Sequence, residues 1–142
     1  MKENWDKAIN FVIEIEGGDT ITNDLSDPGG LTRYGISKKS YPTVDIANLT
    51  EEDAKSIYRQ DYWNACNCDH LSSGIDMAVF DCAVNMGVGT AKLMLQQSPT
   101  WQDFMLNRID RYIEITRKNA TLQKFFRGWM IRCNRLSKLI RG

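Results

Sequence analysis

A helical stripe near the N-terminus ends in a carboxylate and is followed at once by two glycines. Steps of four, three and four residues place four side chains on one helical face: Trp5, Ile9, Val12 and Glu16. The glycine pair at 17–18 is typical of a helix end. The chain must therefore leave its first helix directly after an acidic side chain that continues an apolar face.

This position has consequences for the chemistry of Glu16. Burial on an apolar face and the negative end of the helix dipole both favour the protonated carboxyl over the charged one. A general acid that works near neutral pH needs that protonated form. Glu16 is therefore a candidate catalytic acid. The alternative is a carboxylate that merely ends a helix, with Gly17 as its C-cap.

Further segments extend this observation over most of the chain. They read Glu16-Gly17-Gly18, Asp27-Pro28-Gly29-Gly30-Leu31-Thr32-Arg33-Tyr34-Gly35-Ile36-Ser37, Asp61-Tyr62-Trp63, Cys68-Asp69-His70-Leu71 and Asp76-Met77-Ala78-Val79-Phe80-Asp81-Cys82-Ala83-Val84-Asn85-Met86-Gly87. In this succession the chain resembles glycoside hydrolase family 108, the bacterial and phage N-acetylmuramidases. Residues 126–132 are similar to the predicted peptidoglycan segment that accompanies this family.

The resemblance implies a mostly helical α+β lysozyme-like fold with one small β-hairpin beside the active-site cleft. It also implies a lysozyme activity, the cleavage of the β-1,4 bond between N-acetylmuramic acid and N-acetylglucosamine, with Glu16 as the acid. We expect one compact domain over residues 1–142, with a catalytic part at 1–90 and a basic helical part at 91–142. No cofactor is expected.

The helical pattern agrees with this fold class. The first helix is expected over about residues 4–16 with Asn4 as its N-cap, and short β-prone runs at 20–22 and 31–34 predict the hairpin. The residues Thr50 and Asp53 predict a capping box. Further helices are expected from 50 to about 63, over 75–86 as a buried central helix ended by Gly87 and Gly89, over 91–97, from 98–99 onward, and over 122–140.

Glycoside hydrolysis needs a second group opposite the acid. Asp27 and Asp24 are the nearby candidates, and the hairpin would carry them across from Glu16. Asp27 also starts a good turn sequence, so a purely structural role is the alternative. By analogy with related phage lysozymes, Thr32 is expected to position a water molecule.

Two further residues are candidates for contact with substrate. Tyr34 has an aromatic face that would pack on a sugar ring, or it packs within the hairpin. Asn85 lies near the end of the central helix, where it would face the cleft or cap the helix.

The net charge of zero hides an uneven distribution. Residues 1–90 hold 7 Lys and Arg against 15 Asp and Glu, whereas residues 91–142 hold 11 against 3. The two halves either attract each other or present a basic surface to an anionic partner such as peptidoglycan. A nucleic acid is not expected, because no binding motif accompanies the basic residues and the acidic half would repel phosphate.

Four cysteines give no recognisable metal signature, because Cys66 and Cys68 are too close for the usual zinc spacing. We expect no bound metal. For a protein made in the cytoplasm we expect reduced thiols, and a disulfide from Cys66 or Cys68 to Cys133 is the alternative in an oxidising compartment. No apolar run is long enough to span a membrane, and the chain enters its first helix without a signal-peptide core. The resemblance then implies a monomeric endolysin that reaches the cell wall or periplasm through a holin-type lesion. A silent domain that binds peptidoglycan or a protein, or an unrelated helical interaction protein, is the alternative.

Overall fold

The computed structural model describes residues 2–23 and 30–142. The chain begins with a short 3₁₀ turn, η1 (Lys2–Asn4), and the helix α1 (Trp5–Ile15). Asn4 is the N-cap residue of α1, as the sequence predicts, but its side chain makes no capping hydrogen bond. Its amide instead donates to Ser73 Oγ at 2.9 Å and to Asp76 Oδ2 at 3.0 Å, which ties the start of α1 to the start of a later helix.

A small antiparallel sheet follows α1. It has three short strands in the order β1 (Thr22–Asn23), β2 (Leu31–Arg33) and β3 (Ile36–Ser37). Thr32 pairs with Thr22 on one side and with Ser37 on the other. The predicted hairpin is therefore present, with a third strand that the sequence pattern did not indicate.

The next helical segment has the capping box that its sequence predicts. After the 3₁₀ turn η2 (Ile46–Asn48), α2 (Glu51–Tyr58) begins with Thr50 and Asp53 each bonded to the backbone of the other. The helix then continues as a π-helical segment, η3 (Arg59–Trp63).

The central helix is α3 (Ile75–Met86), which follows the 3₁₀ turn η4 (Cys68–His70). Its first nine residues are all buried, as its nearly all-apolar sequence predicts. Phe80 meets Trp5 and Trp63 edge to face with ring centroids 5.4 Å away from it, so that α1, η3 and α3 share one core. Gly87 ends α3, but Gly89 does not, because it lies in the first turn of α4 (Val88–Gln96).

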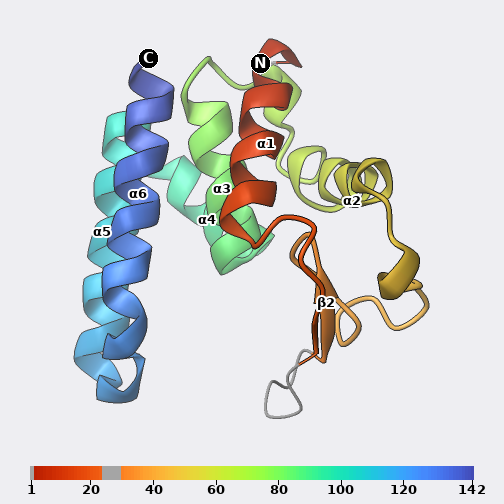
Figure 1. Ribbon diagram of the computed structural model, residues 1–142. Helices are drawn as coiled ribbons and strands as arrows, with labels where there is room; N and C mark the ends of the chain where they lie inside the picture. The colour runs from red at the N-terminus through yellow and green to blue at the C-terminus, as the bar shows by residue number, and fades with distance from the viewer. Residues whose placement is uncertain (1, 24–29) are drawn as a thin grey trace.

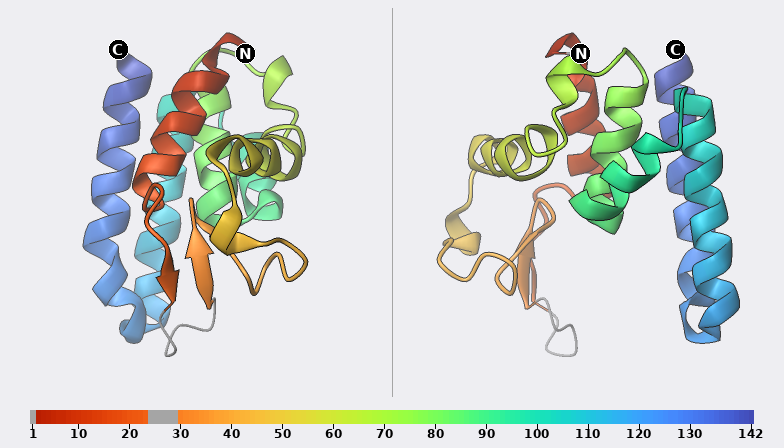
Figure 2. Two further views of the ribbon diagram at one scale, coloured as in Figure 1. Left: turned by 45° about the vertical axis from the view of Figure 1, so that its right-hand side comes forward. Right: turned by 180° about the vertical axis from the view of Figure 1, so that it is seen from behind.

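Two long helices form the C-terminal part. α5 (Trp101–Lys118) begins after Thr100, whose hydroxyl accepts a hydrogen bond from the Asp103 N–H. The 3₁₀ segment η5 (Ala120–Phe125) follows, and α6 (Phe126–Arg141) then runs antiparallel to α5 (Figure 1). The expected last helix is thus an α-helix preceded by a 3₁₀ segment. Figure 2 shows α5 and α6 side by side, with the sheet on the opposite side of α1 and α3. The fold is the mostly helical α+β architecture that the sequence predicts.

Candidate active site

The chain passes from the end of α1 to the sheet (Figure 1), and Glu16 is the C-cap residue of this helix. Its N–H donates to the Val12 carbonyl at 2.9 Å, which completes the last turn of the helix. Gly17 and Gly18 follow with φ angles of 108° and 60°, a backbone region that favours glycine. The Glu16 side chain is 28% exposed, which agrees with the partial burial expected from the apolar stripe.

The turn between β2 and β3 packs directly against Glu16. Gly35 has a φ of +78°, and a Cβ at this position would lie 2.7 Å from the Glu16 Cβ and would also clash with the Tyr58 hydroxyl. Two hydrogen bonds hold the turn in place: the Tyr34 N–H donates to the Gly18 carbonyl at 3.0 Å, and the Tyr58 hydroxyl donates to the Tyr34 carbonyl at 2.8 Å. Burial and the charge of Glu16 both raise the pKa of Tyr58, so this hydroxyl keeps its proton.

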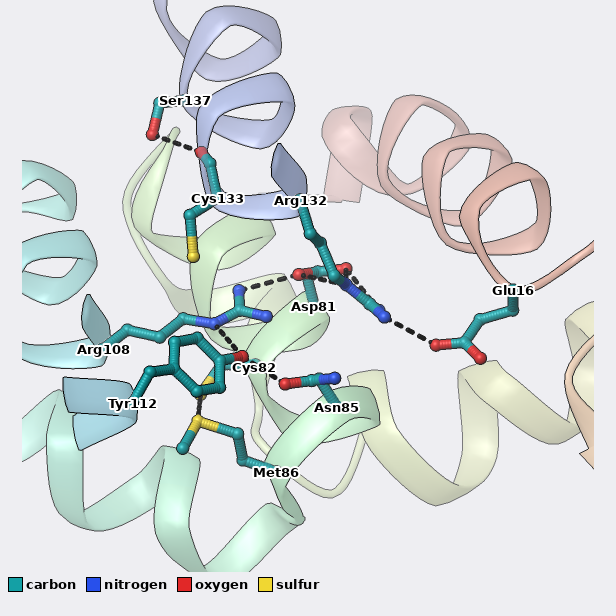
Figure 3. A network of polar contacts seen from close by, with 10 residues as sticks. All are labelled: Glu16, Asp81, Cys82, Asn85, Met86, Arg108, Tyr112, Arg132, Cys133 and Ser137. Carbon is teal, nitrogen blue, oxygen red and sulfur yellow. Dashed lines mark hydrogen bonds and ion pairs between the residues drawn. The ribbon is translucent and has the colours of Figure 1, made fainter. Parts of the chain in front are cut away.

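A guanidinium from the other end of the chain holds the Glu16 carboxylate (Figure 3). Arg132, on α6, donates from Nη1 to Glu16 Oε1 at 2.7 Å. The same side chain donates from Nε and Nη2 to the carboxylate of Asp81, on α3, at 3.1 and 2.8 Å. Arg132 is 8% exposed and Asp81 is 1% exposed, so this pair is buried, whereas the contact from Arg132 to Glu16 is only partly buried.

A second arginine completes the charge balance around Asp81. Arg108, on α5, is fully buried and donates from Nη1 to Asp81 Oδ2 at 2.7 Å. Burial alone would raise the pKa of Asp81, but the two guanidiniums outweigh it and hold this pKa below its usual range. Together with Glu16, the cluster therefore has two carboxylates and two guanidiniums.

The network continues from Arg108 to the end of α3. Arg108 Nε donates to the Tyr112 hydroxyl oxygen at 3.1 Å, and the Tyr112 hydroxyl donates through a short hydrogen bond to Asn85 Oδ1. Burial raises the pKa of Tyr112 to about 12, so its hydroxyl is a donor at neutral pH. Asn85 therefore does not cap α3 with its side chain, and Gly87 takes the C-cap position.

The structure brings two of the six predicted site residues, Glu16 and Asn85, into one polar network (Figure 3). The other four are placed differently or are not described. Thr32 is half-buried on β2 and its hydroxyl donates to the Gly30 carbonyl at 3.3 Å. Tyr34 is 8% exposed and the Arg33 guanidinium lies 5.1 Å from its ring centroid, which leaves little of the ring for a sugar. Asp24 and Asp27 lie outside the described residues.

Sequence reasoning did not single out Asp81 or Arg108, and it placed Arg132 only within residues 126–132 and among the basic residues of the C-terminal part. A signal for Asp81 was present, since a carboxylate within a helix that is apolar all round must be paired when it is buried. No feature of the sequence indicated which residues pair with Asp81. Arg108 and Arg132 lie 27 and 51 residues further along the chain.

All four cysteines are buried free thiols, among them Cys66 and Cys133. Within residues 2–23 and 30–142, no three side chains of His, Cys, Asp or Glu come together as a set of metal ligands. In the same part of the chain, no helix is both long enough and apolar enough to cross a membrane.

Comparison with known proteins gives the family of this chain. The family model described as glycosyl hydrolase 108 matches residues 9–87, more than half of the chain. A solved structure of SagA from Brucella abortus superposes with a TM-score of 0.80 at 25% sequence identity, over 99% of this chain and 96% of that chain. Among curated proteins, none matches. The family match runs from α1 through the end of α3, and the structural similarity extends over α5 and α6. The chain therefore belongs to glycosyl hydrolase family 108 and has its lysozyme-like fold.

Proposed function

We propose that this glycoside hydrolase is an N-acetylmuramidase that cleaves the β-1,4 bond between N-acetylmuramic acid and N-acetylglucosamine, with Glu16 as the general acid. Membership of the family supports peptidoglycan as the substrate. The observation that carries the role of Glu16 is the way its carboxylate is held. Arg132 donates a hydrogen bond to Glu16 Oε1. Glu16 Oε2 has no partner within the described residues, and the Glu16 side chain is 28% exposed.

This arrangement fixes the direction of the Glu16 carboxyl group. A catalytic acid must be fixed in direction, because a small misplacement of the reacting atoms costs much of the rate. Two hydrogen bonds from Arg132 Nε and Nη2 to the Asp81 carboxylate fix the guanidinium, so Glu16 Oε1 has a rigid partner. Glu16 Oε2 is then the atom that carries the proton and gives it to the leaving oxygen.

The second group of the reaction is proposed to be Asp27, with Asp24 as the alternative and Thr32 as the residue that positions water. An inverting enzyme activates water on the face of the sugar opposite the acid, whereas a retaining enzyme forms a covalent intermediate. We propose inversion. Proton NMR of the first product formed from a soluble glycan would show the α-anomer for inversion and the β-anomer for retention.

The substitution Asp27→Asn tests that assignment. It should lower the rate by orders of magnitude while the thermal midpoint stays close to that of the wild type. Asn makes the same local backbone hydrogen bonds as Asp in a turn, so a fully active variant would assign Asp27 to the turn alone. The same measurement on Asp24→Asn would then decide whether Asp24 has the role.

The proposed biological role is that of an endolysin, made in the cytoplasm and active on the cell wall after release. Expression in a bacterial host tests this role. Lysis should follow only when the inner membrane is permeabilised, and the Glu16→Gln variant should not lyse the cells under the same conditions. Lysis without permeabilisation would contradict the dependence on a membrane lesion.

Analysis of the products decides between an enzyme and a silent binding domain. Purified peptidoglycan treated with the wild-type protein should yield muropeptides with N-acetylmuramic acid at the new reducing end. Binding to the wall without new reducing ends would favour a binding domain, and N-acetylglucosamine at the new end would indicate the other glycosidic bond.

A further inference from the structure

A small cavity lies at the far end of the Glu16 network. It has a volume of about 240 Å³ and is bounded by the end of α3, the start of α4, α5, η5 and α6. The lining residues on which the argument depends are Asn85, Arg111, Tyr112, Leu122 and Trp129. Full ligand sites usually measure about 300–1,000 Å³, so a cavity of this size fits one group of a larger substrate.

The network gives Asn85 a fixed orientation in this cavity. A guanidinium can only donate, so the Tyr112 oxygen accepts the hydrogen bond from Arg108 Nε–H. The Tyr112 hydroxyl proton is then donated to Asn85 Oδ1. The amide oxygen of Asn85 is thereby engaged, and its Nδ2 has no partner within the described residues. Figure 3 shows this nitrogen on the side that faces Glu16. Asn85 therefore offers hydrogen-bond donors to a ligand on the side of the cavity that faces Glu16.

Arg111 and Trp129 add further hydrogen-bond donors to the cavity lining, and the Thr90 hydroxyl can donate or accept. Arg111 is exposed, and no ion pair or hydrogen bond engages its guanidinium in the described part of the chain. Trp129 stacks on Tyr112 with ring centroids 4.6 Å apart, and its indole N–H likewise has no described partner. The described lining of the cavity contains no carboxylate, while Leu122 contributes an apolar wall. Such a site recognises a group that is partly apolar and carries an anionic acceptor.

Arg111 also borders a second cavity of about 410 Å³ between α4 and α5. That cavity is lined by Asp110, whose carboxylate would repel an anion. The cavity beside Asn85 is therefore the better fit to an anionic group.

We propose that the cavity beside Asn85 binds the lactyl-linked stem peptide of peptidoglycan, with Arg111 on a peptide carboxylate and Asn85 on a peptide carbonyl. This inference rests on the proposed muramidase function and names its substrate as glycan that carries peptides. The apolar wall accepts the methyl groups of the lactyl unit and of alanine. A peptide on the muramic acid extends about 3.3–3.6 Å per residue from the sugar, and Asn85 belongs both to the lining of this cavity and to the network that ends at Glu16.

Binding of a soluble probe tests the site without any turnover. The probe is N-acetylmuramyl-L-alanyl-D-glutamate, and its matched control carries amides in place of the glutamate carboxylates. Isothermal titration calorimetry with the wild-type protein should show roughly two- to fivefold tighter binding of the acid, because the amide loses the ion pair with the exposed Arg111. Equal affinities for the two probes would overturn the role of Arg111.

Three variants locate the binding. Arg111→Gln should weaken binding of the acid by roughly two- to fivefold and leave the two probes nearly equal. Lys92→Gln removes the same charge from α4 outside the cavity and should bind as the wild type does. Trp129→Phe keeps an aromatic ring on Tyr112 and removes the indole N–H, so it should weaken both probes alike while the protein remains folded by circular dichroism.

Kinetics then separate this inference from the proposed function. The wild type is compared on wall glycan with its peptides and on the same glycan stripped by an amidase. A higher kcat/KM on the peptide-bearing glycan, with a ratio that falls in Arg111→Gln, supports the subsite. Equal rates on the two glycans would overturn the subsite and leave the muramidase intact. Probe binding without cleavage of either glycan would overturn the muramidase and leave the peptide site.

Discussion

Gly35 packs so closely against Glu16 that a Cβ at position 35 would lie 2.7 Å from the Glu16 Cβ. Side-chain Cβ atoms do not approach other atoms to this distance in folded proteins, so one of the two segments would have to move. The turn between β2 and β3 therefore determines where the end of α1 and its carboxylate lie.

The substitution Gly35→Ala should lower both stability and activity. The positive φ and the contact with Glu16 together should cost about 1–3 kcal/mol in the free energy of unfolding, measured with urea. The rate on purified wall should fall further than the loss of folded protein explains, because Glu16 is displaced. The matched control is Gly89→Ala, which lies in α4 with open space around its Cβ and should be neutral or stabilising. A fully active Gly35→Ala enzyme would show that the turn does not position Glu16.

The substitution Glu16→Gln should abolish most of the lytic activity. It preserves the shape of the side chain and removes the transferable proton, a loss that typically costs about 10²–10⁴-fold in rate. Glu14→Gln is the control, because Glu14 is 70% exposed and is paired on the surface with Arg135 at 3.0 Å. Release of reducing ends from wall measures both. Near-wild-type activity of Glu16→Gln would refute its role as the acid.

Removal of the charge at Asp81 should destabilise the fold. Asp81→Asn leaves Arg108 and Arg132 buried with one charge fewer to pair with, a change that typically costs about 3–5 kcal/mol. Asp110→Asn, an exposed residue on α5, should change the free energy of unfolding by less than about 0.5 kcal/mol. Urea denaturation at neutral pH compares the two, and a similar small effect for both would contradict the importance of the buried cluster.

Acid should weaken the folded state through the same carboxylate. The pKa of Asp81 in the folded protein lies below its ordinary value of 3.8, so its contribution to stability is complete above that value and is lost as the pH falls through the folded-state pKa. The free energy of unfolding should therefore decrease below about pH 4, and this decrease should be smaller in Asp81→Asn. Denaturation curves at several pH values measure it, and parallel profiles for the two proteins would assign the acid sensitivity to other carboxylates.

Binding to insoluble wall should weaken with salt if the exposed basic residues of the C-terminal part contact it. Lys124, Arg127 and Lys138 are exposed, and screening shortens their reach to about 8 Å at physiological ionic strength. Their replacement by Gln should reduce co-sedimentation with wall, whereas Lys39→Gln in the acidic half should not. Arg132 belongs to the buried network and is excluded from this set, although its sequence groups it with the basic residues. Binding that is independent of salt would assign these charges to a solvated surface.

The sequence alone determined the elements that depend on neighbours along the chain. The spacing from Trp5 to Glu16 specified α1 and the face on which Glu16 lies, because a helical face follows from the 3.6-residue period. Thr50 and Asp53 specified the start of α2 in the same local way. The apolar composition of residues 75–86 specified a buried central helix, and the succession of motifs indicated the family.

Only the tertiary structure decided what surrounds Glu16. Its partner Arg132 lies 116 residues away, and the pair shares Asp81, whose own sequence position indicates a buried charge but names no partner. Asn85 acquires its donor orientation from Tyr112 and Arg108 on another helix. Pairings of this kind depend on which helix faces pack together, and helical periodicity places a side chain on a face without specifying the face it meets.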